Sequence, residues 1–275
     1  MKISLIITTH NNPVALKKVI DSILSQTRLP DEVFIADDGS DRDTFHVVKK
    51  FFEITPFPIV HVWQEYKGFR AAKIRNEAIK KSSGEYIILL DGDCIVNRHF
   101  ISDHLLLAEK GYFTQGKRVL VGKGVEAVFN HDHANSAMTL IKMALTGKIS
   151  NVHHLIRLPP IFIFKNKRLK GIKSCNMGFF KKDIITVNGF NEDFEGWGNE
   201  DSELACRFFK YGLVKKVPPF MAICFHLWHP TNKIITNRNK QLQLATLALK
   251  EYYCKNGLEK KFSGKLDSLD SVNRY

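Results

Sequence analysis

An apolar run that ends in two carboxylates constrains this chain more than any other feature. Residues 86–96 have the sequence YIILLDGDCIV. Consecutive aliphatic residues predict a strand that is buried on both faces. Unpaired charges are costly inside an apolar core. Asp91 and Asp93 are therefore expected just beyond the carboxyl end of that strand, at one edge of a sheet.

The segment Asp91-Gly92-Asp93 is a candidate metal site. Side chains two residues apart in an extended segment point to the same side, and Gly92 allows another group to approach the backbone closely. Two neighbouring carboxylates favour a cation, and oxygen ligands suit a hard divalent ion such as Mg2+ or Mn2+. A solvated turn is the simpler interpretation of an isolated Asp-Gly-Asp. The choice between a metal site and a turn therefore depends on the motifs in the rest of the chain.

Size and composition fit an intracellular globular protein. The 275 residues suffice for one large α/β domain or two small ones, and 44% of them are hydrophobic. No apolar run approaches the roughly 20 residues that cross a bilayer, and the N-terminus lacks the pattern of a signal peptide. We therefore expect a cytoplasmic protein. The five cysteines are widely spread, which favours reduced thiols over disulfides or a zinc site.

The net charge of +13 predicts an anionic partner, which the charge alone cannot identify. Nucleic acid, an acidic membrane surface and phosphorylated substrates are all candidates. The densest basic stretch is 165–173, and by itself such a stretch is more typical of a solvated loop.

The first part of the chain alternates between predicted strands and helices. Strands are expected at 3–9, 32–36, 59–63 and 86–90, and helices over about 14–26, 44–52 and 71–81. This alternation predicts an α/β fold with a parallel sheet and right-handed crossovers. Three of the strands end in polar clusters, at 8–11, 37–38 and 91–93. Ligands of open α/β sheets bind at the carboxyl ends of the strands, so these clusters are expected to converge.

The second half of the sequence is less regular. Segment 136–146 has the pattern of an amphipathic helix, for which ordinary packing is a better interpretation than a membrane-surface helix. The histidine pairs at 131/133 and 153/154 are expected on the surface or in loops rather than at a metal. A last helix is expected over 241–253, followed by a polar tail over 255–275.

A second unusual cluster lies at residues 195–201, with the sequence EGWGNED. Two glycines around Trp197 predict an exposed aromatic side chain. Glu200 and Asp201 follow at a predicted helix start, where carboxylates are favoured. If this stretch stood alone, acidic capping of the helix and a core tryptophan would explain it.

Taken together, these motifs resemble family 2 glycosyltransferases of the GT-A fold. The resemblance spans about 1–110 and 171–230, and the later part is similar to galactosyltransferases and to bacterial chondroitin-type polymerases. It implies a Rossmann-like, mostly parallel central sheet flanked by helices, with a nucleotide-sugar-binding half at 1–110 and an acceptor-binding half at 111–254. The segments that share the pattern are Thr8-Thr9-His10-Asn11, Asp37-Asp38-Gly39-Ser40, Gly68-Phe69-Arg70, Arg75-Asn76, Asp91-Gly92-Asp93, Asn188-Gly189-Phe190 and Gly196-Trp197-Gly198-Asn199-Glu200-Asp201.

The resemblance also implies roles for individual residues. Asp93 corresponds to the direct ligand of Mn2+ or Mg2+, together with either His226 or His229, which the sequence does not separate. A carboxylate opposite the donor must accept the proton of the acceptor hydroxyl. Asp201 is the expected base, with Glu200 orienting the acceptor and Trp197 stacking on a sugar ring. The residues expected to bind the nucleotide sugar are Thr8, Asp38, Arg70, Asn76, Asp91 and Asp93.

The expected activity is the inverting transfer of a sugar, hexosyl or N-acetylhexosaminyl, from a nucleotide diphosphate donor such as a UDP-sugar. A glycan or glycolipid of lipopolysaccharide or capsule is the expected acceptor, with peripheral contact at the inner face of the cytoplasmic membrane and no nucleic acid. Asn199 stands where the family motif has its second glycine, which puts the backbone angles of that loop in question. The alternatives are a sugar nucleotidyltransferase, which would release pyrophosphate, and a non-catalytic nucleic-acid-binding protein.

Overall fold

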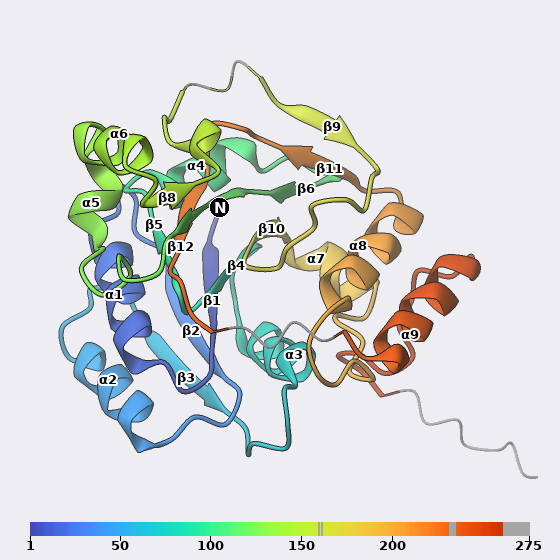
Figure 1. Ribbon diagram of the computed structural model, residues 1–275. Coiled ribbons are helices and arrows are strands. Elements are labelled where there is room, and N and C mark those ends of the chain that lie inside the picture. The colour runs from blue at the N-terminus through green and yellow to red at the C-terminus, as the bar shows by residue number, and fades with distance from the viewer. Residues whose placement is uncertain (159, 161, 231–234, 261–275) are drawn as a thin grey trace, which may run out of the picture.

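The computed structural model describes residues 1–158, 160, 162–230 and 235–260. Within these ranges the centre is an eight-stranded sheet with the order β3-β2-β1-β4-β10-β6-β11-β9 (Figure 1). Its strands are β1 (Ile3–Thr9), β2 (Glu32–Asp37), β3 (Ile59–Trp63), β4 (Tyr86–Asp91), β6 (Tyr112–Gln115), β9 (Phe164–Asn166), β10 (Asn176–Phe180) and β11 (Val214–Val217).

The half of this sheet built by the first part of the chain is parallel, as the alternation of strands and helices predicted. Strands β3, β2, β1 and β4 run in one direction. Strand β10 is antiparallel to both β4 and β6, and β9 is antiparallel to β11. In register, Thr8 on β1 pairs with Ala36 on β2 and with Asp91 on β4. The three polar strand ends therefore meet at one edge, as expected.

A smaller sheet brings the end of the chain back to that edge. Its order is β5 (Cys94–Val96), β12 (Ile223–His226), β7 (Lys117–Val121) and β8 (Ile149–Ser150). Strand β12 pairs with β5 so that His226 lies opposite Cys94. The backbone N–H of Leu227 donates to the carbonyl of Asp93 at 2.9 Å. A histidine and an aspartate that are far apart in sequence thus become neighbours.

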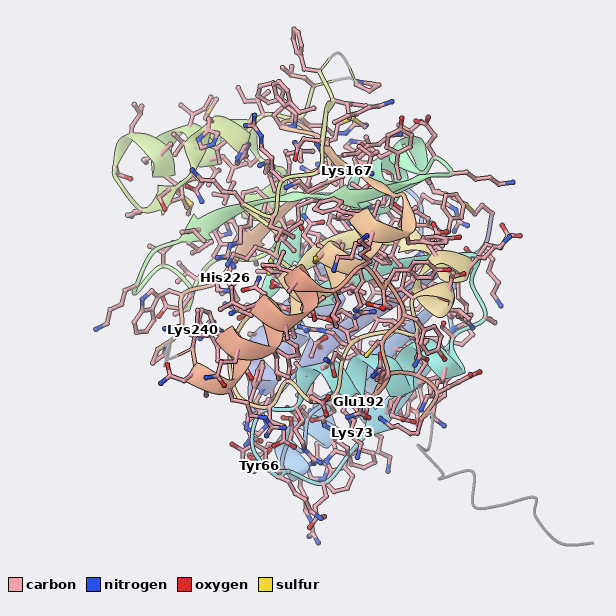
Figure 2. All side chains as sticks on the ribbon, turned by 90° about the vertical axis from the view of Figure 1, so that its right-hand side faces the viewer. Tyr66, Lys73, Lys167, Glu192, His226 and Lys240 are labelled. Carbon is pink, nitrogen blue, oxygen red and sulfur yellow. The ribbon has the colours of Figure 1, made fainter. Side chains whose placement is uncertain are left out.

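Helices cover both faces of the large sheet (Figures 1 and 2). Because neighbouring strand residues point to opposite faces, Leu5 packs with α1 and α2, whereas Ile6 packs with α3, α7 and α8. The helices are α1 (Pro13–Leu24), α2 (Arg42–Phe52), α3 (Ala71–Lys81), α4 (Phe100–Leu107), α5 (His131–Asn135), α6 (Ala137–Leu145), α7 (Lys181–Thr186), α8 (Glu200–Tyr211) and α9 (Asn237–Ala248), with a 3-10 turn at Val152–His154.

Several elements differ from the sequence-based expectation. The last helix begins earlier than predicted, because the hydroxyl of Thr236 caps it by accepting from the N–H of Asn239. Strands β6, β9 and β11 were not predicted; each is only three or four residues long and forms by pairing with distant strands.

The start of the predicted polar tail is attached to the body of the protein. The amide of Asn256 donates to Asp193 at 2.7 Å, and Leu258 packs against the core that contains α8. Residues 261–275 lie outside the described part of the chain. All five cysteines are free and buried, as the spread of their positions predicted. Among the described residues, no helix combines the length and the apolar character needed to span a membrane.

Candidate active site

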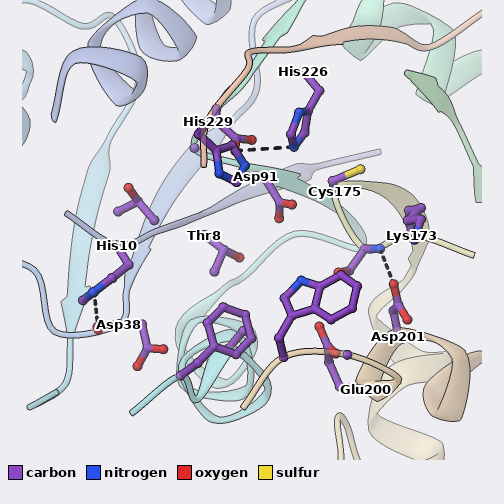
Figure 3. A pocket seen from close by; sticks show the side chains of 18 of the residues that line it. Thr8, His10, Asp38, Asp91, Lys173, Cys175, Glu200, Asp201, His226 and His229 are labelled. Atoms are coloured by element: carbon purple, nitrogen blue, oxygen red, sulfur yellow. Dashed lines mark hydrogen bonds and ion pairs between the residues drawn. The ribbon is translucent and has the colours of Figure 1, made fainter. Parts of the chain in front are cut away.

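A cavity of about 740 Å³ opens where the strand ends converge (Figure 3). Thr8, Asp38, Asp91 and Asp93 line it from the first part of the chain. His226, His229, Trp197, Glu200 and Asp201 line it from the second. The structure therefore brings together, in one cavity, nearly all of the residues that the sequence singled out.

Asp93, His226 and His229 form a cluster that can hold a metal ion. One ligand atom from each residue lies within 4.8 Å of the other two. The Asp93 carboxylate is 3.0 Å from His229 Nε2 and 3.5 Å from His226 Nε2. One carboxylate and two imidazoles are a donor set that divalent transition metals accept. The sequence left the choice between the two histidines open, and the structure places both at Asp93.

Charge is concentrated around this cluster. Burial favours the neutral form of Asp93, but the hydrogen bond from His229 and the charges of both imidazoles outweigh it and lower the pKa of Asp93. The same hydrogen bond raises the pKa of His229. Asp91 has no such partner set: burial, with a smaller contribution from the Asp93 charge, raises its pKa to about 6 despite the nearby Arg75.

Arg75 joins the two halves of the cavity. It lies on α3 and is only 3% exposed. Its guanidinium donates to the hydroxyl of Thr8 at 3.1 Å, to Glu200 at 3.2 Å and to Asp91 at 3.3 Å. Burial disfavours its charge, yet the two carboxylates raise the pKa of Arg75. Arg75 belongs to the Arg75-Asn76 segment that the resemblance included, but the amino-acid sequence did not indicate which residues it contacts.

Glu200 and Asp201 stand at the first turn of α8, as predicted. The two carboxylates have different surroundings from each other. Glu200 is buried against Arg75, and burial together with the Asp201 charge raises the pKa of Glu200. Asp201 Oδ1 accepts from the Ser202 N–H at 2.6 Å, whereas Asp201 Oδ2 has a long contact of 3.4 Å from the Ser174 N–H. Asp201 Oδ2 is therefore the carboxylate oxygen more available to a ligand in the cavity.

The loop before α8 tolerates asparagine in place of glycine. Asn199 has a φ of +75° and Gly198 a φ of +102°, both in the left-handed region. Asparagine adopts this region more readily than most residues. The substitution therefore preserves the turn that presents Trp197, whose side chain is 37% exposed.

Two of the predicted nucleotide-sugar residues do not line the cavity. The amide of Asn76 is buried and donates to the carbonyl of Phe190 and to Glu192, both at 2.9 Å, so Asn76 anchors the segment that precedes α8. The guanidinium of Arg70 bonds the carbonyl of Glu65, outside the cavity lining. Neither side chain reaches the cavity in this structure; Arg70 instead contributes its backbone N–H, which bonds Asp38 at 2.6 Å.

Asp38 is a buried residue of the cavity lining. It is 2% exposed, and besides Arg70 it accepts from the Gln64 amide at 2.6 Å. Its carbonyl is 2.9 Å from His10 Nδ1, and the His10 ring stacks on Tyr66 with centroids 4.7 Å apart. This side of the cavity thus has a fixed carboxylate beside a stacked aromatic pair.

Sequence reasoning missed Arg118, Lys173 and Trp228, which also line the cavity. Arg118 stands on β7, and its guanidinium is 3.9 Å from the Cys175 sulfur. Trp228 follows β12, with the Lys123 ammonium 5.2 Å from its ring centroid. Arg118 and Trp228 reach the cavity through pairing in the smaller sheet, whereas Lys173 lies in the basic stretch 165–173, just before β10, where its backbone N–H bonds Gln115 at 2.9 Å.

Solved structures share this architecture. TarS of S. aureus matches with a TM-score of 0.58 and 18% identity, over 82% of this chain and 60% of that one. A mannosyltransferase from Pyrobaculum calidifontis, solved with GDP-Man and Mn2+, matches with a TM-score of 0.55 and 19% identity, over 84% of this chain and 58% of that one. The fold is that of GT-A glycosyltransferases.

The chain belongs to glycosyl transferase family 2, whose model matches residues 4–181. Residues 163–230 match the model described as the N-terminal domain of galactosyltransferase. The hyaluronan synthase of Pasteurella multocida is 27% identical over 86% of this chain and 25% of its own length. The chondroitin synthase of Escherichia coli is 24% identical over 99% of this chain and 42% of its own length. The chain thus spans less than half of these relatives.

Proposed function

We propose that this chain transfers a sugar from a nucleotide diphosphate donor, a UDP-sugar, to a hydroxyl of a growing surface glycan such as lipopolysaccharide or capsule. The transferred sugar is a hexose or an N-acetylhexosamine, and the anomeric centre is inverted. The observation that supports this most strongly is one cavity with the Asp93, His226 and His229 cluster on one side and Glu200 and Asp201 on the other (Figure 3).

The donor occupies the side built by the first part of the chain. Asp38, beside the stacked His10 and Tyr66 rings, binds the nucleoside. Thr8 contacts the nucleoside together with Asp38, and Asp91 contacts the ribose or the donor sugar; Arg75 holds both Thr8 and Asp91. These positions lie at the carboxyl ends of parallel strands, where nucleotides bind in open α/β sheets.

Asp93, His226 and His229 hold a divalent cation, which when bound stabilises the negative charge that develops on the leaving diphosphate. Mn2+ suits this mixed set of one carboxylate and two imidazoles better than Mg2+, which prefers oxygen ligands. The three residues would hold the cation on the side of the cavity that faces Glu200 and Asp201.

Asp201 acts as the general base on the opposite side of the cavity. Its Oδ2 accepts the proton of the acceptor hydroxyl as the hydroxyl oxygen attacks the anomeric carbon and the bond to the diphosphate breaks. Because this is one displacement without an enzyme nucleophile, it inverts the anomeric configuration. Glu200 is held by Arg75 and orients the acceptor, and Trp197 stacks on a sugar ring.

Membership in family 2 favours this activity over a sugar nucleotidyltransferase or a nucleic-acid-binding protein. The relatives named hyaluronan and chondroitin synthase support a polysaccharide acceptor. The net charge of +13 is consistent with a phosphorylated donor and an anionic acceptor or membrane surface.

The test is release of nucleoside diphosphate from a panel of sugar nucleotides, with Mn2+ or with EDTA. Hydrolysis or transfer of one UDP-sugar, dependent on metal and abolished in Asp93→Ala, is expected, and it identifies the donor. Asp201→Ala is expected to bind UDP with Mn2+ as the wild type does but not to turn over. Release of pyrophosphate, or no calorimetric binding of UDP in the presence of Mn2+, would contradict the proposal.

A further inference from the structure

Helix α6 is apolar on two opposite faces. With about 3.6 residues per turn, Met138, Ile141 and Leu145 lie within one narrow sector of the helix. Their exposed fractions are 82%, 49% and 84%. Leu140, on the opposite face, is 4% exposed and packs in the core. A helix that is apolar all round is normally buried, so the outward face of α6 lacks the covering that its composition favours. The prediction that segment 136–146 packs as an ordinary amphipathic helix explains only the buried face of α6.

Lysines surround this outward face. Lys142 borders the stripe of Met138, Ile141 and Leu145 on α6 itself. Beside the helix, a shallow groove is lined by Val128, which is 64% exposed, by Met143, and by Lys123 and Lys148. For the described part of the chain, no ion pair is recorded for these three lysines.

The segment 123–148, which contains α6 and the groove, has three lysines and two carboxylates, Glu126 and Asp132. Glu126 interacts with Lys18, and Asp132 is 3.5 Å from His131. The charge presented around the apolar face of α6 is therefore positive.

We propose that the outward face of α6, with the groove lined by Lys123, Val128 and Lys148, docks on an anionic lipid bilayer. Apolar side chains in one stripe, flanked by lysines, are the composition of helices that lie in the membrane interface. Lysines near such a surface add attraction to anionic headgroups. The positive charge around the patch and the net charge of +13 favour an anionic bilayer over an uncharged apolar partner.

The position of the patch relates it to the cavity. Lys123 lines the groove, and its ammonium lies 5.2 Å from the ring centroid of Trp228, which lines the candidate active site. Figure 1 shows α6 at the opposite side of the molecule from α9. A bilayer bound at α6 would thus lie beside one wall of the active site, where an acceptor carried by a membrane lipid can enter. The membrane contact itself does not depend on the proposed transferase activity.

The test is co-sedimentation of the full chain with vesicles of phosphatidylglycerol and phosphatidylcholine in equal parts, or of phosphatidylcholine alone. Binding to the anionic vesicles is expected, with weaker binding in higher salt. The double variant Met138→Ser with Leu145→Ser removes the apolar stripe. The double variant Lys142→Glu with Lys148→Glu keeps the apolar stripe and reverses the charge at its border. Each pair is expected to weaken binding at least tenfold.

The matched control is Leu244→Ser with Leu247→Ser on α9, two leucines that are 64% and 43% exposed. This control is expected to bind vesicles as the wild type does. Absence of wild-type binding to anionic vesicles would overturn the proposal, as would an equal loss in the α9 control. Self-association in the absence of vesicles that is abolished by Met138→Ser with Leu145→Ser would also overturn it, since a second copy of the chain would then be the partner of α6.

Discussion

Arg75 and Glu200 form a buried ion pair with Nη1 and Oε1 3.2 Å apart, although 125 positions separate them in the sequence. The pair joins α3, in the half of the chain that carries the Asp91 strand end, to the first turn of α8. Arg75 also contacts Asp91 at 3.3 Å. One guanidinium therefore neutralises carboxylates on both walls of the cavity and fixes their relative position.

Arg75→Met is expected to destabilise the fold and to disturb the cavity. It leaves Asp91 and Glu200 buried without their cation, which typically costs about 3–5 kcal/mol. Urea denaturation measures the stability, and calorimetry with UDP and Mn2+ measures the binding of the folded fraction, which we expect to fall.

Arg207→Met is the matched control for Arg75→Met. Arg207 is 2% exposed and pairs with Glu203 at 2.8 Å, on α8 but outside the cavity lining. Arg207→Met should lower the stability about as much as Arg75→Met does, while the affinity of the folded protein for UDP and Mn2+ stays unchanged. Equal loss of affinity in both variants would show that Arg75 acts through stability alone.

His226→Gln and His229→Gln are each expected to weaken Mn2+ binding at least tenfold, because both imidazoles lie at Asp93. Calorimetric titration with Mn2+ in the presence of UDP measures the affinity for the metal. His131→Gln, on α5, is the control and should bind Mn2+ normally. If one of the two variants keeps full affinity, the other histidine is the metal ligand.

Asp201→Asn is expected to reduce sugar transfer by about 10²–10⁴-fold, the usual range for loss of a general base. Asn keeps an oxygen to accept from the Ser202 N–H, so the affinity for UDP and Mn2+ should not change. Glu200→Gln, which keeps an acceptor for Arg75, should lower turnover less. A larger effect of Glu200→Gln would transfer the role of base to that residue.

Asn239→Leu is expected to impair acceptor use more than donor binding. The amide of Asn239 is fully buried and donates to the carbonyl of Gly198 at 3.1 Å, so α9 holds the Trp197 loop in place. Losing such a buried partner typically costs about 1–3 kcal/mol. The Michaelis constant for acceptor should rise while the affinity for UDP is retained, and an unchanged Michaelis constant would count against this role for α9.

Stability should decrease as the pH falls from about 6.5 to about 4, in part because of His104. Burial lowers the pKa of His104 to about 4, and its Nε2 lies 3.0 Å from Asn176 Oδ1. Between these values the unfolded chain takes up a proton that the folded chain does not, so protonation favours unfolding. The full shift corresponds to about 3 kcal/mol.

His104→Gln is expected to flatten this pH dependence, measured as the free energy of unfolding in urea at pH 7 and pH 4.5. Burial also lowers the pKa of His154 to about 4. This histidine was expected on the surface or in a loop, and it is in fact 7% exposed. His154→Gln should remove a further part of the slope, and the double variant should have a smaller slope than either single variant. Identical slopes in wild type and the His104 variant would refute the assignment.

Local pattern sufficed for the parallel half of the sheet. The runs at 3–9 and 86–90 contain enough consecutive aliphatic residues to specify buried strands, and the polar residues after them follow from the cost of burying charge. The short strands β6, β9 and β11 were not predictable, because their sequences are too brief to show a period and their pairing partners are distant.

The sequence by itself determined the fold class and singled out the carboxylates Asp91, Asp93, Glu200 and Asp201, because charges at strand ends and at a helix start are chemically unusual, and the resemblance to family 2 glycosyltransferases added the two candidate histidines. Only the tertiary structure decided what these groups meet. Pairing of β12 with β5 placed both histidines at Asp93, and the packing of the fold brought Arg75 on α3 to Asp91 at the end of β4 and to Glu200 at the start of α8. The tertiary structure also directs the Asn76 amide to the carbonyl of Phe190 and leaves one face of α6 exposed. Contacts between distant segments depend on register and packing, which no local stretch of sequence encodes.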